Sequence, residues 1–353
     1  MLFRSLEEEI KILELGLPPH KSDGFIGGRL HPKEASLILL PVPWEATVSY
    51  KEGTANAPEN IRISSHQLDV ENFHYIKPYE AGICMLKSSK SILRLSNKAR
   101  KKAIKVIEAL EKNKIDKKNL HYVNKASKIL NNFVYKKAIE NINQKKFVAV
   151  IGGDHSSPFG LIKALNDKTN KSFGILHIDA HHDLRKAYEG FTYSHASIFY
   201  NVMNECKNVS NLIQIGIRDY SNEEAQRLLN FGEKADCLYD ANMQQQLASG
   251  KSLDEILNPY IDKLPQNIYL SIDIDGLEPV NCPNTGTPVP GGLRYAELEY
   301  LIFMLVKKGK SIIGFDLCEV GCSKNGWDEN VGARVLYQLC GALLASQNKI
   351  GFK

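Results

Sequence analysis

Several features that would place this 353-residue chain in a special class of protein are missing from it. No apolar run approaches the ~18–20 residues that a membrane-spanning helix needs. The seven cysteines are scattered without a CxxC pair, which argues against a zinc ribbon and favours reduced thiols. The net charge of +5 is too small to indicate nucleic-acid binding, and the glutamate-rich N-terminal segment does not resemble an export signal. We therefore expect a cytoplasmic globular protein with neither a membrane nor a nucleic acid as partner.

Short apolar, β-branched runs alternate with helical stretches along most of the chain. Such alternation, with near-continuous apolar strands, is typical of a parallel sheet buried under helices on both faces. The sequence thus predicts an α/β fold, a three-layer αβα sandwich with a central, mainly parallel sheet. The expected strands are residues 36–41, 147–151, 173–178, 212–217, 268–274 and 311–317, and the expected helices are residues 158–166, 196–206, 222–230, 252–263, 295–308 and 331–347.

No internal repeat or low-complexity linker divides the chain. We predict one α/β domain over residues 36–353, preceded by an N-terminal extension over residues 1–35. Residues 88–146 stand out because they are rich in lysine and asparagine and show helical apolar spacing. Two interpretations of this segment stay open. The favoured one is a pair of helices with a solvated face, and the other is a basic surface for an acidic partner.

Three predicted strands run directly into acidic and histidine side chains. In parallel α/β sheets, ligands bind beyond the carboxyl ends of the strands, and residues two apart in an extended segment face the same way. These side chains are therefore predicted to converge at one edge of the sheet. The three clusters are Gly152-Gly-Asp-His155-Ser156, Asp179-Ala-His181-His-Asp183 and Asp273-Ile-Asp275-Gly276.

Converging carboxylates need positive charge nearby, because each one disfavours the ionised form of the others. Two divalent cations would cancel the charge of the four carboxylates Asp179, Asp183, Asp273 and Asp275, which is the physical argument for a binuclear metal centre. Oxygen-rich ligation with one imidazole per metal favours Mn²⁺ or a similar ion. The alternative is that each aspartate only caps a turn, an interpretation that suits one cluster better than three.

With these motifs the chain resembles the ureohydrolases, the family of arginase and agmatinase, from about Leu40 to about Leu343. The stretches Ser49–Pro58, Ser271–Pro279 and Gly286–Leu293 also look like segments of that family. The resemblance implies an arginase-like fold and hydrolysis of a guanidino compound to urea and an amine. It further implies two divalent ions per chain, Mn²⁺ or alternatively Ni²⁺, and a homo-oligomer, either a trimer or a hexamer.

The resemblance also implies roles for single residues. His195 would carry protons to the leaving amine, Asp183 would accept a hydrogen bond from a bridging hydroxide, and Glu319 would bind the guanidinium group through paired hydrogen bonds. The plainer interpretation is that His195 only begins a helix and that Glu319 only faces solvent. One metal would be held by His155, Asp179, Asp183 and Asp273, and the other by His181, Asp179, Asp273 and Asp275, so that Asp179 and Asp273 bridge.

The substrate depends on residues outside these motifs. The segment Asp183–Gly190 resembles agmatinase-type members more than arginases, so agmatine is the preferred substrate, with free guanidine and formiminoglutamate as alternatives. Arg185, Tyr188 and Trp327 are predicted to contact the substrate. His182 stands where small residues are common in the family, and we interpret it, like His177, as structural.

Two hypotheses of other kinds compete with this one. A related single-zinc deacetylase shares the general fold, but it would not need the full set of ligands for a second metal. A catalytically silent scaffold would use the Lys-rich segment to bind an acidic partner and would turn over no guanidine.

Overall fold

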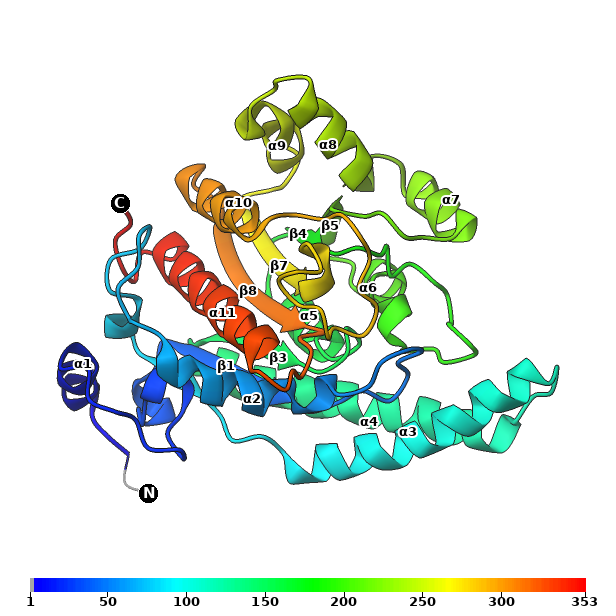
Figure 1. Ribbon diagram of the computed structural model, residues 1–353, viewed down its shortest axis with the longest axis horizontal. Coiled ribbons are helices and arrows are strands. Elements are labelled where there is room, and N and C mark those ends of the chain that lie inside the picture. Colours follow the sequence, from blue (N-terminus) through cyan, green and yellow to red (C-terminus); the bar gives the residue numbers. More distant parts are fainter. Residues whose placement is uncertain (1–2) are drawn as a thin grey trace.

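The strands of the chain form a single sheet in which all neighbours run parallel. The computed structural model describes residues 3–353 (Figure 1), and within them the strand order is β2-β1-β3-β8-β7-β4-β5-β6. The central strands β3, β8, β7 and β4 thus point their carboxyl ends to the same edge. The strands are β1 (Leu37–Val42), β2 (Ile83–Met85), β3 (Phe147–Gly152), β4 (Phe173–Ile178), β5 (Val209–Ile215), β6 (Ala235–Leu238), β7 (Asn267–Asp273) and β8 (Ser311–Cys318).

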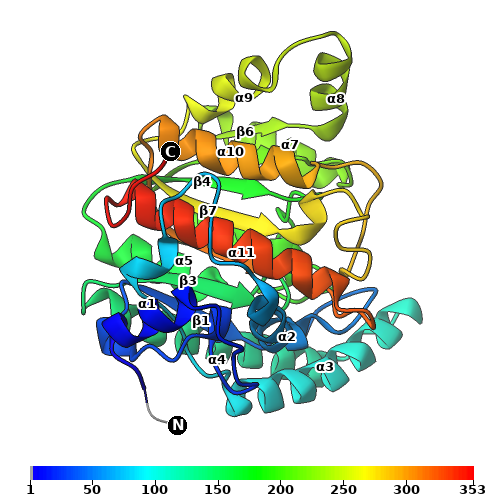
Figure 2. The ribbon, with the colours of Figure 1, turned by 60° about the vertical axis from the view of Figure 1, so that its left-hand side comes forward.

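Helices cover both faces of this sheet, so the predicted αβα sandwich is confirmed. Figure 2 shows α10 and α11 crossing the near face. One buried cluster joins the sheet to α2 (Ala57–Ser64), α8 (Asp240–Ala248), α9 (Leu253–Ile261), α10 (Tyr295–Lys307) and α11 (Trp327–Ser346). A second cluster joins its other face to α3 (Lys90–Glu111), α4 (Lys117–Ile142), α5 (Phe159–Lys168), α6 (Ile198–Glu205) and α7 (Asn222–Asn230).

Burial on both faces explains why the strands read as continuous apolar runs. In β7, Ile268 and Leu270 belong to the first cluster while Tyr269 between them belongs to the second. Successive side chains of a strand point to opposite faces, so a strand covered by helices on both sides needs apolar residues at nearly every position.

All six predicted strands are present, with ends shifted by up to three residues, and the two strands that the sequence did not predict are the edges β2 and β6. Both are short, and β6 carries the polar Asp236 at its second position. The six predicted helices are also present, although the last begins at Trp327 rather than at residue 331. Three further helices were not predicted, namely α1 (Leu6–Glu14), α2 and α8.

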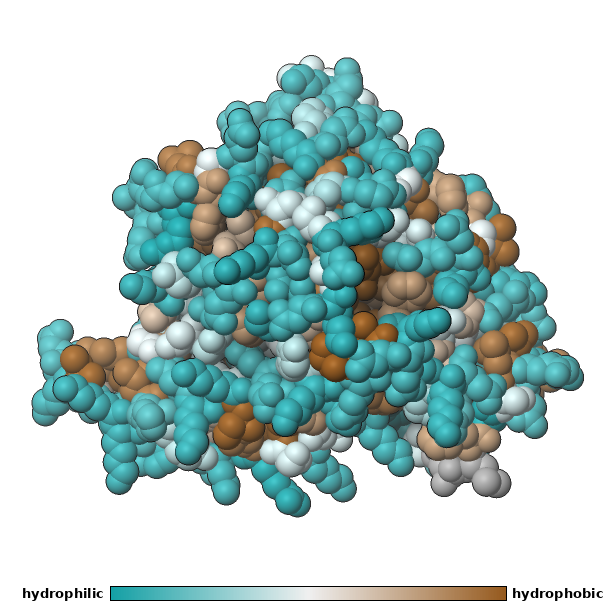
Figure 3. Space-filling view, turned by 180° about the vertical axis from the view of Figure 1, so that it is seen from behind, coloured by the Kyte–Doolittle hydropathy of each residue, from teal (hydrophilic) through white to brown (hydrophobic). Residues whose placement is uncertain are grey.

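Residues 88–146 form the two predicted helices, α3 and α4, whose joined ends project beyond the rest of the molecule in Figure 1. Ser89 and Asp116 begin them by accepting hydrogen bonds from Ile92 N and Asn119 N. Figure 3 shows the molecule from behind as mainly hydrophilic with small apolar patches. No helix within residues 3–353 is long and apolar enough to cross a membrane.

The part of the N-terminal segment that is described, residues 3–35, is folded. Ser5 and Glu8 form a capping box at the start of α1. The buried Glu9 accepts hydrogen bonds from Arg29 N at 2.6 Å and from Arg4 Nη1 at 3.1 Å. The division of the chain into an extension and a domain stays a prediction.

Candidate metal centre

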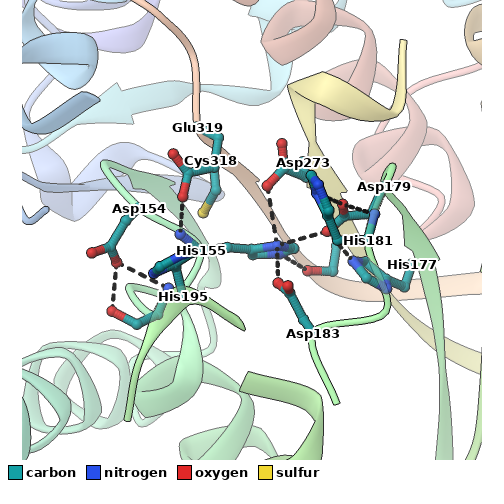
Figure 4. A network of polar contacts seen from close by, with 12 residues as sticks. Asp154, His155, His177, Asp179, His181, Asp183, His195, Asp273, Cys318 and Glu319 are labelled. Atoms are coloured by element: carbon teal, nitrogen blue, oxygen red, sulfur yellow. Dashed lines mark hydrogen bonds and ion pairs between the residues drawn. The ribbon is translucent and has the colours of Figure 1, made fainter. Parts of the chain in front are cut away.

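The four central strands deliver the predicted site residues to one place. His155 follows β3, Asp179 follows β4, Asp273 ends β7 and Glu319 follows β8. Figure 4 shows the imidazole of His155 reaching from the β3 side toward Asp273, Asp179 and Asp183. The convergence arises because parallel neighbours end at a common edge, where α/β sheets bind ligands.

The first cluster surrounds Nδ1 of His155. This nitrogen lies 3.1 Å from Asp179 Oδ2, 3.1 Å from Asp183 Oδ2 and 3.4 Å from Asp273 Oδ2. Burial alone would lower the pKa of His155, but these carboxylates raise it well above its ordinary value. One nitrogen thus faces three carboxylate oxygens in a site almost closed to water.

The second ring nitrogen of His155, Nε2, already has a hydrogen-bond partner. The hydroxyl of Ser271 donates to Asp316 Oδ2 at 2.8 Å, so its oxygen is left to accept from His155 Nε2 at 2.9 Å. Without a cation, the raised pKa of His155 keeps a second proton on Nδ1; a cation that displaced this proton would meet the Nδ1 lone pair, because Nε2 keeps its own proton toward Ser271. Metal-ligating histidines commonly have this arrangement, with the second nitrogen fixed by a hydrogen bond. The donor set therefore fits a divalent cation.

The second cluster lies around His181. Its Nδ1 is 3.2 Å from Asp275 Oδ2 and 3.4 Å from Asp179 Oδ1. Asp179 therefore turns one oxygen to each histidine, as a bridging ligand would. Ligand atoms of Asp179, His181 and Asp275 all lie within 4.8 Å of one another, and so do those of His155, His177, Asp179 and Asp183.

The protein itself supplies too little positive charge for these acids. Burial and the neighbouring Asp275 and Asp179 raise the pKa of Asp273 well above its ordinary value. Burial and Asp179 raise the pKa of Asp183 to about 7. Carboxylates of this kind stay ionised only when cations join them, and a pair of divalent ions has the required charge.

Asp183 and Glu319 are held in strained backbone conformations. Their φ angles are 54° and 58°, in the left-handed region that residues with a side chain rarely adopt. Such conformations cost about 1–3 kcal/mol and gather at functional sites, where the surrounding structure enforces them.

Glu319 has one oxygen that is satisfied and one that is not. Its Oε1 accepts the backbone N–H of His155 at 3.0 Å, while the buried Oε2 has no hydrogen-bond partner among the described residues. Burial, with Asp273 and Asp154 nearby, raises the pKa of this carboxyl well above its ordinary value. An unpartnered buried acceptor beside a cavity is a place for a donor from a ligand.

Glu319 and the two clusters border one cavity of about 170 Å³. The cavity is small enough that a guanidinium group on Glu319 would lie close to the clusters. Its lining residues are Ser49, His155, His181, Asp183, Arg185, Tyr188, His195, Ala196, Asp219, Tyr220, Glu224, Asp273, Thr287 and Glu319.

His195 lies on the cavity wall, in a 3₁₀ turn that precedes α6. Its backbone N and its ring Nδ1 are each 3.2 Å from Oγ1 of the buried Thr47, and the ring of Tyr188 meets its imidazole edge-on at 5.6 Å. Burial and the nearby positive charge of His181 lower the pKa of His195. The ring is thus neutral and held from two sides.

The other predicted substrate residues lie in different surroundings. Arg185 and Tyr188 line the cavity, but the Arg185 guanidinium is stacked 4.6 Å from the Tyr188 ring centre and its Nε lies 3.3 Å from Glu224 Oε2. Trp327 does not line the cavity; it is 46% exposed, and its Nε1 donates to Val280 O at 2.9 Å. The substrate contacts of all three stay predictions.

The α3–α4 hairpin supports the loops that carry the cavity residues. Asn124 accepts a hydrogen bond from Thr192 N at 2.9 Å and donates to Gly190 O at 3.2 Å, which fixes the segment between Tyr188 and His195. On the loop after β1, which carries the cavity residue Ser49, the backbone N–H of Glu45 donates a hydrogen bond to Ser96 Oγ at 3.0 Å. The Lys-rich segment therefore has a structural role at the site.

Sequence reasoning missed several residues at the site. Ser271 and Thr287 lie inside stretches that resemble the ureohydrolase family, and Thr47 lies two residues before another such stretch. These residues could therefore have been singled out, but their contacts could not be derived from the sequence. Gln214 lies inside β5 and Asp219 follows that strand, neither of them in a polar motif, and only the fold brings them to the site.

The described residues form a parallel α/β sandwich with two adjoining His/Asp clusters, and Glu319, whose Oε2 has no partner, borders the same cavity. These features define a class of protein that uses metal ions to act on a small cation. Residues 35–341 match the model of the Arginase family, and the chain belongs to that family.

Individual relatives agree with this assignment. The chain is 28% identical over 309 residues to an N(1)-aminopropylagmatine ureohydrolase of Thermus thermophilus, covering 88% of this chain and 90% of the relative. It is 32% identical over 317 residues to the protein of that name from Thermococcus kodakarensis, covering 89% and 93%. The crystal structure of agmatine ureohydrolase of Thermoplasma volcanium has the same fold, with a TM-score of 0.66 at 21% identity over 90% of this chain and 93% of that one.

Proposed function

We propose that this chain hydrolyses a guanidino compound to urea and an amine, with agmatine or an agmatine derivative as substrate. The observation that carries the proposal is the unpartnered Oε2 of Glu319, which borders the same cavity as both His/Asp clusters. Family membership supports the reaction, and the names of the relatives from Thermus and Thermococcus support an agmatine-like substrate.

Two divalent ions, Mn²⁺ or alternatively Ni²⁺, would complete the site. His155, Asp179, Asp183 and Asp273 would hold one, and His181, Asp179, Asp273 and Asp275 would hold the other. When bound, such a pair supplies positive charge and lowers the pKa of water at the site.

Glu319 would bind and orient the guanidinium group. Its carboxylate is fixed at Oε1 by the backbone of His155, so Oε2 is directed by the fold rather than by the ligand. A charge-assisted hydrogen bond to this oxygen is strong because water is excluded from it.

His195 would transfer a proton to the departing amine nitrogen. Thr47 holds its Nδ1, which leaves Nε2 as the atom free to face the substrate. A neutral imidazole can take up a proton and release it, as general acid–base catalysis requires.

The charges at the cavity mouth favour a cationic tail. Arg185 lies beside Glu224, whereas the side chain of Asp219 is 69% exposed and its Oδ2 is 4.0 Å from His181 Nε2. Asp219 thus adds an exposed carboxylate at the mouth that forms no ion pair with an arginine or a lysine among the described residues, which suits the terminal ammonium of agmatine better than the carboxylates of arginine or formiminoglutamate.

A urea-release screen tests the proposal. The protein is reconstituted separately with manganese and nickel and offered agmatine, N(1)-aminopropylagmatine, guanidine, arginine and formiminoglutamate. Turnover of an agmatine-type amine at the highest kcat/KM supports the proposal. Turnover of guanidine alone would contradict the substrate, and no turnover by metal-loaded protein would favour the non-catalytic scaffold.

The oligomeric state and the cytoplasmic location stay predictions. The single-zinc deacetylase is disfavoured because His155 and Asp183, which a second metal would need, are present and bring their ligand atoms within 4.8 Å of those of Asp179.

A further inference from the structure

A chain of hydrogen bonds runs from Asp179 away from the cavity to Tyr239 at the end of β6. His177 Nε2 lies 2.7 Å from Asp179 Oδ2, and Gln214 Nε2 lies 2.7 Å from His177 Nδ1. His182 Nδ1 lies 2.7 Å from Gln214 Oε1, and the Tyr239 hydroxyl lies 3.3 Å from His182 Nε2. Figure 4 shows the first link, with His177 beside Asp179. His177, Gln214 and His182 are all fully buried.

One contact fixes the direction of the whole chain. Gln214 Nε2 also lies 3.0 Å from the backbone carbonyl oxygen of His182, which can only accept. The amide is therefore oriented with its NH₂ group toward both this carbonyl and His177 Nδ1. His177 must then carry its proton on Nε2 and donate it to Asp179. Because Gln214 Oε1 is an acceptor, His182 carries its proton on Nδ1 and its Nε2 accepts from Tyr239.

This arrangement removes His177 from the set of metal ligands. Its ring lies close enough to His155, Asp179 and Asp183 to qualify by distance. However, the lone pair on Nδ1 is taken by Gln214, and Nε2 carries the proton. The ring can only support Asp179, which agrees with the structural role that the sequence indicated.

The two oxygens of Asp179 are then anchored separately. Oδ2 accepts from the His177 ring at 2.7 Å and faces His155 Nδ1 at 3.1 Å. Oδ1 accepts from the backbone N–H of His181 at 2.6 Å and faces His181 Nδ1 at 3.4 Å. Each oxygen thus has one fixed donor and one open side toward a different histidine.

We propose that Gln214 and His182 are positioning residues that act through His177 to hold Asp179 in the orientation of a ligand bridging two metal ions. The inference rests on the metal centre of the proposed function. Partners that orient a metal ligand typically account for about 10–100-fold in metal affinity. His182 closes the chain, since its backbone carbonyl and its ring together hold both ends of the Gln214 amide.

Three variants separate positioning from simple packing. His182→Ala removes the donor to Gln214 Oε1, whereas the side-chain amide of His182→Asn can place an N–H near the position of Nδ1. Gln214→Glu replaces the donor to His177 by an acceptor of the same size. Mn²⁺ dissociation constants are measured by competition with a chelating dye, and circular dichroism of the metal-free proteins checks folding.

We expect His182→Ala and Gln214→Glu to weaken Mn²⁺ binding about 10–100-fold, and His182→Asn to stay within about threefold of the parent. Equal affinity in all variants, or loss of affinity in His182→Asn as large as in His182→Ala, would overturn the inference.

A second test measures the tautomer of His177 in the unaltered protein. In metal-free protein labelled with ¹⁵N at histidine, the ring of His177 should show the neutral form with its proton on Nε2 at mildly alkaline pH. A proton on Nδ1 would overturn the inference. If the parent binds no metal, the proposed function fails, and the tautomer of His177 still decides whether the hydrogen-bonded chain has the stated direction.

Discussion

The backbone N–H of His155 donates to Glu319 Oε1 at 3.0 Å, so the residue proposed to bind a metal and the residue proposed to bind the guanidinium are joined directly. Glu319 Oε2 has no hydrogen-bond partner within residues 3–353. A substitution at Glu319 that keeps the acceptor but removes the charge therefore separates substrate binding from metal binding.

Glu319→Gln should retain both metal ions and lose turnover. A hydrogen bond to a charged group contributes about 1.5–3 kcal/mol, which corresponds to a loss in kcat/KM of about 10–150-fold. Steady-state kinetics with metal analysis of the same sample checks this. Loss of metal along with activity would show that Glu319 belongs to the metal centre instead.

Asp273→Ala should lose metal and activity together, because Asp273 is proposed to serve both ions. Asp69→Ala is the matched control, since Asp69 is exposed, belongs to neither cluster and does not line the cavity, so it should leave the metal content unchanged. Metal content is measured by elemental analysis after dialysis. Activity retained at normal metal content in Asp273→Ala would contradict the ligand assignment.

His195→Ala should keep both ions and turn over about 10²–10⁴-fold more slowly, the usual contribution of a general acid–base group. Thr47→Val, which removes the hydroxyl at 3.2 Å from His195 Nδ1, should have a smaller effect on kcat with normal metal content. A fall in metal content in His195→Ala would show that the residue is structural.

Asn124→Ala should loosen the loop that leads to His195, because two backbone groups, Thr192 N and Gly190 O, lose their partner. We expect a loss of about 1–3 kcal/mol in the free energy of unfolding and faster proteolysis near residue 190. Lys125→Ala, at an exposed neighbouring position, serves as control. Equal stability of the two variants would show that the hairpin does not support the loop.

Removing metal should lower the thermal stability of the protein. Buried carboxylates such as Asp183 and Asp273 lose their compensating charge, and a ligand that binds only the folded state stabilises it in proportion to its affinity. Calorimetry with and without a chelator measures the change, and adding back Mn²⁺ should restore the transition. An unchanged transition temperature would argue against a structural metal pair.

The sequence predicted the central strands and the residues that follow them well, because each strand and its metal-type residues lie within one short segment of the chain. The strands that lead to His155, Asp179 and Asp273 are apolar runs, and after two of them the metal-type residues are two apart, so strand geometry determines which side chains converge. The edge strands β2 and β6 were not predicted because they are short and only partly apolar.

Contacts between distant segments could not be predicted from one sequence. Gln214 meets His177 and His182 across more than 30 positions of the chain, and nothing in its own strand marks it as part of the site. Trp327 was predicted to contact the substrate because it lies close to Glu319 in sequence; the start of α11 directs its indole toward Val280 O, and its substrate contact stays a prediction.

A crystal structure of the manganese-loaded protein, with anomalous scattering measured for the metal, tests the proposed pair of ions directly. We expect two manganese peaks per chain, one beside His155 and one beside His181, with Asp179 and Asp273 contacting both. A single peak, or none at these residues in protein soaked with excess manganese, would contradict this expectation.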